Sequence, residues 1–250
     1  MKKLLSIALL SSVFALSSEG SAMEEGVTNT SAASSNKSIS PRDHNKDQEI
    51  WTTKIEPYVP KDSIFLGFLT NEEEKTYINI AQNEKNVSIN VGGNANTVLN
   101  NLKTKNCLNN IKALDLSQSG VTFKGVQLLK DVDTLEFLDL SHTPITGKAL
   151  QDLPLNIKFL KIEQGRNIGG YIQHLNKLKN LEVLGLAGAT LQREDIENIK
   201  SMESLKYIDL SMIHCDDDEL FDAKEILKNS KSTIIWDRTS QQIYGDSVSS

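Results

Sequence analysis

A spacing of apolar residues, Leu-x-x-Leu-x-Leu, repeats along the middle of the chain and organises residues 87–236. Five copies start at Ile111, Leu135, Ile157, Leu181 and Leu205, at steps of 24, 22, 24 and 24 residues. A looser copy covers residues 87–91, and a closing apolar run covers residues 233–236. Each copy alternates apolar residues with others, which predicts a short strand that has one buried face.

The segments between these strands carry polar or small residues followed by a helical pattern. Apolar residues at helical spacing occupy three of them, at 125–129, 149–153 and 220–227. Thr122, Thr146 and Asp216 stand at equivalent positions before these runs, where a side-chain oxygen accepts hydrogen bonds from the free amides of a helix. Residues 216–219 also fit a capping box, so we interpret this acidic stretch as a helix start and not as a metal site.

Together these patterns resemble the leucine-rich repeat family, in its helix-backed form, over residues 87–236. The resemblance implies an α/β solenoid, or horseshoe, with a parallel sheet on the concave side and helices on the convex side. Each unit is expected to bury its apolar face against its neighbours. Many members of the family carry an asparagine after the strand, whereas this chain has Ser119, Thr143, Gly165, Ala189 and Ile213.

Strand alternation separates the buried residues from those on the concave face of the predicted sheet. The leucines point to the core, so the residues between them line up on the open face from repeat to repeat. We expect this face to bind a partner protein through aromatic anchors, with charged side chains that select the ligand. The candidate partner-binding residues are Phe137, Phe159, Tyr207, Asp115, Asp139, Asp209, Lys161 and His142. The alternative is that these columns form cross-strand pairs that stiffen the sheet.

The N-terminus carries the pattern of a secretory signal peptide over residues 1–22. Two lysines precede an apolar run that is too short to span a bilayer, and small residues follow it. We therefore expect cleavage and export, and no later segment has the length and apolarity of a membrane span. Residues 23–57 are rich in polar residues, with late apolar positions at 50, 51 and 55, and this composition predicts a flexible leader.

Residues 58–86, ahead of the repeats, show two apolar runs separated by an acidic turn. The pattern predicts a helical cap, made of two short helices, that covers the open apolar end of the first repeat. Residues 59–83 also show a limited resemblance to an F-box. In its family this small helical motif binds the Skp adaptor of a ubiquitin ligase, so the resemblance implies an exported effector that is delivered into a host cell. Residues 237–250 are predicted to be a disordered tail.

Composition and charge exclude several classes of function. The chain has 250 residues, of which 38% are hydrophobic and 24% charged, as in an ordinary globular protein. Its net charge of −6 argues against nucleic acid, which requires clustered lysine and arginine. The four histidines show no ligand spacing and no catalytic or phosphate-binding motif occurs, so we expect no enzyme activity, cofactor or metal. Cys107 and Cys215 belong to distant repeats, and the spacing of stacked strands places them on the order of 20 Å apart. Because a disulfide requires much closer alpha carbons, we expect two free, buried thiols.

These observations favour an exported, monomeric, non-enzymatic module that recognises another protein on its concave sheet. Its expected location is the medium, the cell surface or the periplasm. Two alternatives stay open, namely an F-box-like adaptor of a host ubiquitin ligase and a structural protein of the envelope or cell surface.

Overall fold

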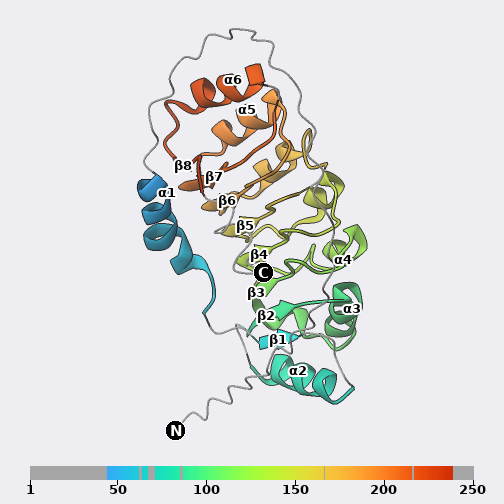
Figure 1. The fold of residues 1–250 in the computed structure, drawn as a ribbon. Coiled ribbons are helices and arrows are strands. Elements are labelled where there is room, and N and C mark those ends of the chain that lie inside the picture. Colours follow the sequence, from blue (N-terminus) through green and yellow to red (C-terminus); the bar gives the residue numbers. More distant parts are fainter. Residues whose placement is uncertain are drawn as a thin grey trace, which may run out of the picture. The chain divides into compact units, whose positions relative to one another are not determined.

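One parallel sheet lies between the helices and an N-terminal helical segment. The structure is a computed structural model, and it describes residues 44–61, 64–66, 71–84, 87–165, 167–215 and 217–238. In these residues eight strands follow one another in chain order, and each pairs in parallel with the next (Figure 1). The strands are β1 Ile64–Leu66, β2 Val87–Val91, β3 Ile111–Asp115, β4 Phe137–Asp139, β5 Phe159–Lys161, β6 Val183–Gly185, β7 Tyr207–Asp209 and β8 Thr233–Ile235. Strands β2 and β8 confirm the strands predicted at the two ends of the repeat region.

The repeated leucines lie in register and build a continuous core on one side of the sheet. Leu138 pairs with Leu114 on one neighbouring strand and with Leu160 on the other, and the row continues through Leu184 and Ile208. All five side chains are fully buried. Because each unit covers the apolar face of the next, the stack requires the same apolar residues in every copy.

Strands β2 to β7 are each followed by a turn that contains a residue with positive φ. The equivalent positions, with φ between 54° and 67°, are Gly93, Gln118, His142, Gln164, Gly188 and Met212. The amide of Gln118 donates to the carbonyl of Ser141 in the next turn at 2.9 Å, and the following turns repeat this bond. Near the position where the family often has asparagine, the hydroxyls of Ser119 and Thr143 donate to the carbonyl three residues earlier, both at 2.6 Å. Local side-chain bonds of this kind close the turn without an asparagine.

Helices and helical turns cover the apolar side of the sheet (Figure 1). They are α2 Asn71–Asn83, α3 Ala95–Thr104, η3 Leu108–Asn110, α4 Phe123–Gln127, η4 Gly147–Asp152, η5 Ile172–Lys177, α5 Arg193–Ser201 and α6 Asp217–Leu227. In α3 the buried residues are Ala95, Val98, Leu99 and Leu102, which is the spacing of one helical face. The helical pattern of the sequence thus corresponds to the layer that closes the core.

The predicted helix caps are correct in position but wrong in chemistry. Thr122 and Thr146 occupy the N-cap positions of α4 and η4, yet neither side chain makes a cap hydrogen bond. The Thr122 hydroxyl instead lies 3.2 Å from the amide nitrogen of an asparagine in the preceding repeat, which donates to it. Asp216 lies outside the described residues. A capping box does occur at α5, where Gln192 and Asp195 each accept from the other's backbone amide.

The segment before the repeats differs from its prediction. The sequence predicts two helices over 58–86, but residues Ile64–Leu66 form β1, which extends the sheet beside β2. The second predicted helix is present as α2. A run of three apolar residues has no periodicity that distinguishes a strand from a helix, and pairing with β2 decides the outcome.

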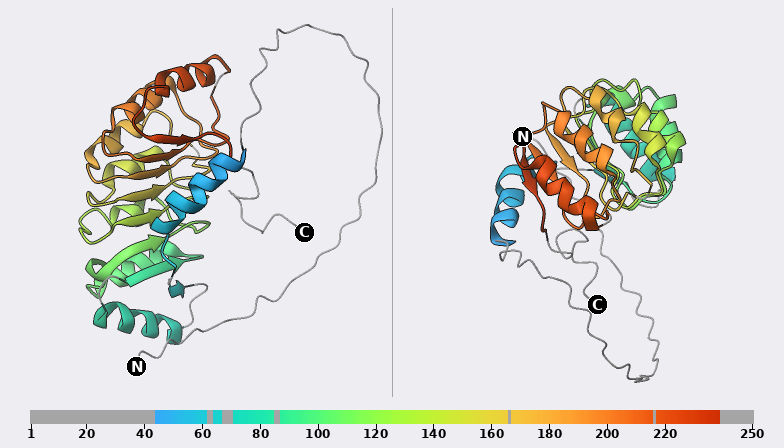
Figure 2. Two further views of the ribbon diagram at one scale, coloured as in Figure 1. Left: turned by 90° about the vertical axis from the view of Figure 1, so that its left-hand side faces the viewer. Right: turned by 90° about the horizontal axis from the view of Figure 1, so that it is seen from above.

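The flexible leader predicted over 23–57 is wrong for its last residues. α1 His44–Ile50, the π-helical turn η1 Trp51–Ile55 and the 3₁₀ turn η2 Glu56–Tyr58 form one helical run, which we call the strap (residues 44–58). The strap lies on the face of the sheet opposite the helices (Figure 2). Residues 1–43, with the predicted signal peptide, lie outside the described residues.

Two further predictions, on the C-terminal tail and on the two cysteines, are wrong in part. The disordered tail predicted from 237 is wrong for Arg238, which is only 2% exposed, while residues 239–250 lie outside the described residues. Cys107 and Cys215 are not joined in a disulfide, as predicted, but only Cys107 is buried and Cys215 is half-buried.

Parallel strands in repeat order, equivalent turns after the strands and helices on one face define an α/β leucine-rich repeat solenoid. No helix among the described residues has both the length and the apolarity needed to cross a membrane.

Candidate functional site

A second apolar cluster lies on the concave face of the sheet and is separate from the main core. Its buried members from the strands are Ala113, Phe137, Phe159, Val183 and Ile235, and Ile55 of the strap completes it. Ile50, Trp51, Tyr58, Val59 and Tyr207 pack around it. Ile55 is fully buried, whereas Thr52, Thr53 and Lys54 are exposed, so the strap is amphipathic and presents its apolar side to the sheet.

Aromatic rings form the centre of this cluster. Phe137 and Phe159 are neighbours on β4 and β5, and their rings stack with centroids 4.5 Å apart and an interplanar angle of 20°. Tyr58 of the strap contacts the same stack, with its ring centroid 6.3 Å from that of Phe159. Aromatic pairs at these separations contribute stabilisation beyond the area that they bury.

A buried charge cluster lies beside the aromatic rings. The Arg238 guanidinium pairs with Glu163 and lies 3.1 Å from Asp209, although this second contact lacks hydrogen-bond alignment. Lys161 links Glu163 to Asp139, with both ion pairs at 3.3 Å. Except for Lys161, which is half-buried, these side chains are buried.

The strap supplies the cover of this charge cluster. The guanidinium carbon of Arg238 lies 3.9 Å from the centroid of the Trp51 ring, and the Lys161 ammonium lies 5.7 Å from the same ring. Both distances are typical of cation–π contacts, which strengthen when the cation is removed from water. Trp51 therefore joins the apolar and the ionic halves of the concave face.

Burial changes the ionisation of this cluster. It raises the pKa of Glu163 above its ordinary value, although Lys161 and Arg238 oppose the change. Burial also lowers the pKa of Lys161, but Asp139 and Glu163 outweigh it, so that this pKa lies above its ordinary value. A buried ion cluster of this kind is costly if one partner is lost, because the remaining charges stay desolvated.

The Asp-Leu-Ser motif, which recurs in three repeats, has a structural role. In each copy one carboxylate oxygen accepts from the backbone amide of the serine two residues later, at 2.9 Å for Asp115, 2.8 Å for Asp139 and 2.9 Å for Asp209. This is an Asx turn, which fixes the chain where it leaves the strand. The second oxygen of Asp115 accepts from Asn90 at 2.6 Å. In Asp139 and Asp209 the second oxygen faces Lys161 and Arg238, respectively.

Polar contacts hold both ends of the strap. At one end, a carboxylate oxygen of Asp47 accepts from the backbone amides of Trp236 and Asp237, both at 3.1 Å. At the other end, the Tyr58 hydroxyl donates to Glu182 at 2.8 Å. Burial, together with this hydrogen bond and the charge of Glu182, raises the pKa of Tyr58 to about 12. The strap is thus fastened to positions more than 120 residues away in sequence.

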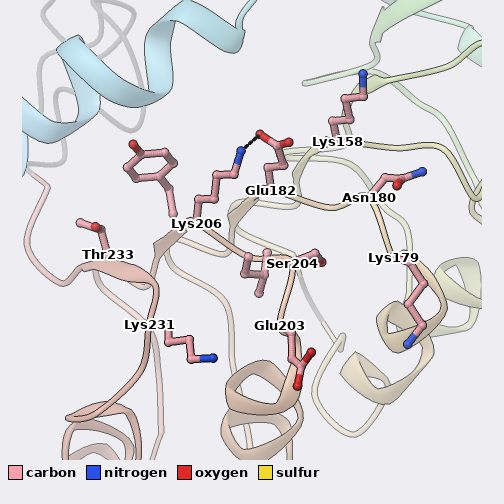
Figure 3. A pocket seen from close by; sticks show the side chains of 11 residues that line it. Lys158, Lys179, Asn180, Glu182, Glu203, Ser204, Lys206, Lys231 and Thr233 are labelled. Atoms are coloured by element: carbon pink, nitrogen blue, oxygen red, sulfur yellow. Dashed lines mark ion pairs between the residues drawn. The ribbon is translucent and has the colours of Figure 1, made fainter.

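A row of alternating charges runs along the edge where the strands begin. Glu136 lies 3.4 Å from Lys112 and 3.1 Å from Lys158, and Lys206 lies 2.8 Å from Glu182 in the following repeats. An open depression of about 610 Å³ adjoins this row, and Figure 3 shows the Lys206 side chain beside Glu182, with which it forms an ion pair. The charges of the row are paired with one another, and the lining of the depression also contains Lys179, Lys231 and Glu203.

The structure brings most of the predicted partner-binding residues together, but it does not leave them open to solvent. Phe137, Phe159, Asp139 and Asp209 are buried, and Asp115, Lys161 and Tyr207 are half-buried. The expectation of an open concave face is wrong because the strap covers it. His142 lies apart from the others, in the left-handed turn after β4.

Sequence reasoning missed the strap and two buried charges. The available signal for the strap was the helical spacing of Ile50, Trp51 and Ile55, the late apolar residues of the predicted leader. Glu163 and Arg238 carry no signal of their own, since their burial arises from the pairing of residues 75 positions apart.

No family model matches the chain, and no curated protein matches it. Among solved structures, the chain is similar to the crystal structure of an internalin (inlF) from Listeria monocytogenes str. 4b F2365, with 19% sequence identity and a TM-score of 0.43. The match covers 63% of this chain and 48% of the internalin, so the chain spans about half the length of that protein. The similarity carries no argument about function.

Proposed function

We propose that this chain is a non-enzymatic module that recognises a partner protein on the concave face of its solenoid. The observation that supports the proposal is the strap itself, because this face already holds a helical segment through stacked aromatic rings and covered ion pairs. Aromatic anchors and desolvated arginine are the features that dominate the energy of protein interfaces. Phe137, Phe159 and Tyr207 serve as the anchors of the proposed surface.

The charged residues of the same face serve as its selective part. In this proposal Asp115, Asp139, Asp209 and Lys161 set the polarity that a partner must match, while His142 extends the surface at the turn edge. Complementary charge gives specificity and rate of association more than raw affinity. The partner is a protein and not a nucleic acid, in accordance with the net charge of −6.

Export belongs to the same proposal. Residues 1–22 act as a signal peptide, and the mature chain works as a monomer in the medium, at the cell surface or in the periplasm. The adaptor alternative requires a small helical motif over 59–83. Because β1 belongs to the sheet, this alternative loses its main support, and we do not retain it.

Affinity capture with concave and control variants tests the proposal. The tagged mature chain is incubated with culture medium and with lysates of cells that the producing organism contacts, and bound proteins are identified by mass spectrometry. Phe137→Ala should abolish capture of a specific partner, whereas Leu155→Ala, at an exposed position on the turn side, should leave it unchanged. Circular dichroism confirms that both variants are folded. Equal capture by both variants would place the recognition surface elsewhere.

A further inference from the structure

We propose that the strap is an in-chain substitute for the partner, and that the partner contributes an amphipathic helix which takes the strap's place. This inference rests on the proposed function and specifies the chemistry of the partner. The partner helix carries an aliphatic and aromatic pair like Ile50 and Trp51, an aliphatic residue one turn later like Ile55, and an aromatic residue with a hydrogen-bond donor like Tyr58.

The first argument is the independence of the solenoid from the strap. The main core, which runs from Ala81 to Leu227 along the repeats, contains no residue of the strap. The described hydrogen bonds that link the strap to the sheet all use a strap side chain, from Asp47 or Tyr58, and none uses a strap backbone group. Release of the strap therefore breaks no bond of the parallel ladder and opens no part of the main core.

The second argument is the nature of the contact. The strap touches the sheet with one face only, through a fully buried Ile55 and through Trp51 over Arg238. A helix that places spaced apolar anchors in a groove is a common mode of recognition between separate proteins. The strap makes this type of contact within its own chain.

The third argument is the cost of an empty face. Without the strap, the stacked rings of Phe137 and Phe159 would become an exposed apolar patch of the kind that monomeric proteins avoid. Arg238 beside them would lose the Trp51 ring that covers it. An occupant must supply an aromatic ring over Arg238 and an apolar side chain in the position of Ile55. The polar outer face of the strap is not used, so a partner needs to reproduce only its inner side.

The charge of the face defines the occupant further. Its carboxylates, Asp115, Asp139, Glu163 and Asp209, outnumber its two cations, Lys161 and Arg238. Over these charges the strap places Ile50, Trp51, Ile55 and Tyr58, whereas its inner acidic residue, Asp47, accepts from the backbone amides of Trp236 and Asp237 at one end of the strap. An occupant helix with an acidic inner face is therefore disfavoured.

A synthetic peptide with the sequence of residues 44–58 tests the inference on the full mature chain. The peptide carries a fluorophore at its N-terminus, and its binding is followed by anisotropy. The intact chain should bind it weakly because the tethered strap occupies the site. Ile55→Ala in the chain weakens the tethered strap and should increase the apparent affinity for the free peptide at least tenfold. Lys54→Ala, at an exposed position of the strap, is the matched control and should bind like the unmodified chain.

The outcomes separate this inference from the proposed function. Hydrogen exchange of the strap amides confirms that Ile55→Ala opens the strap, and Tyr58→Phe replaces it if circular dichroism shows that Ile55→Ala is unfolded. If a chain with an open strap does not bind the peptide, or if the chain and all its variants bind it equally, the inference is wrong. Loss of partner capture in Phe137→Ala would still support the proposed function in that case.

Discussion

The fully buried side chain of Ile55 provides the sharpest test of how the strap is held. The substitution Ile55→Ala removes three carbon atoms from the concave apolar cluster, in which Ile55 is 0% exposed. At about 0.8 kcal/mol for each buried carbon, plus the cavity that remains, the loss is about 2 to 4 kcal/mol. Because the main core contains no strap residue, this loss should fall on the docking of the strap and not on unfolding of the solenoid.

Native-state hydrogen exchange measures both quantities in one sample. For Ile55→Ala, the amides of residues 50–56 and 58 should exchange roughly 30- to 900-fold faster, the factor that corresponds to about 2 to 4 kcal/mol. Amides of the central strands β4 to β6 should keep their protection. The matched control is Leu184→Ala, at an equally buried position of the main core, which should lower the protection of these strands. If Ile55→Ala lowers the protection of strap and strands by the same amount, the strap is part of one cooperative core and our reasoning is wrong.

Three further predictions concern substitutions at single positions. The hydroxyl of Tyr58 should titrate near pH 12 by tyrosinate absorbance, with Tyr58→Phe as the blank, and Glu182→Gln should lower its pKa. Because the pKa of Tyr58 is higher in the folded than in the unfolded chain, its contribution to the free energy of unfolding is complete below pH 10 and is lost as the pH rises through 12. Gly188→Ala should lower the free energy of unfolding, measured in urea, by about 1 to 2 kcal/mol, because it places a side chain on a backbone with φ of +67°. Met212→Ala should have little effect, because position 212, at φ 54°, already carries a side chain in the left-handed conformation. Arg238→Met should lower the free energy of unfolding by about 3 to 5 kcal/mol in the same assay, because it leaves the buried Asp209 without a cation and Glu163 with Lys161 alone.

Each of these predictions has a clear contrary result. A Tyr58 midpoint near 10 that does not respond to Glu182→Gln would mean that its hydroxyl is not bonded as described. Equal effects of Gly188→Ala and Met212→Ala would remove the role of the left-handed turn. A neutral Arg238→Met would show that the buried charges are neutralised in some other way.

The solenoid could be predicted from the sequence because its pattern is both local and repeated. Leu138 and Leu140 lie within one strand and its turn, and the same spacing returns in each copy, so alternation alone assigns them to the core. Asp139 shows the limit of this argument. Alternation places it on the concave face correctly, but only the structure shows that it binds the amide of Ser141.

The cover of the concave face could not be predicted in the same way. Composition predicts that Ile50, Trp51 and Ile55 cannot order a segment by themselves. Their order comes from a surface that is built by strand residues 58 to 185 positions away, from Ala113 to Ile235. The contact between Trp51 and Arg238 has no counterpart in any local pattern. Non-local packing of this kind overrides the preference of the segment, which is why the end of the predicted leader is helical.

The position of the strap on the concave face is the central claim, and a single distance tests it most directly. The rings of Tyr58 and Phe159 have centroids 6.3 Å apart. In a sample with selectively labelled aromatic residues, a nuclear Overhauser effect between the protons of these two rings is predicted, and it should disappear in Tyr58→Leu. The absence of this effect in the intact, folded chain would contradict the account, because the concave face would then be open.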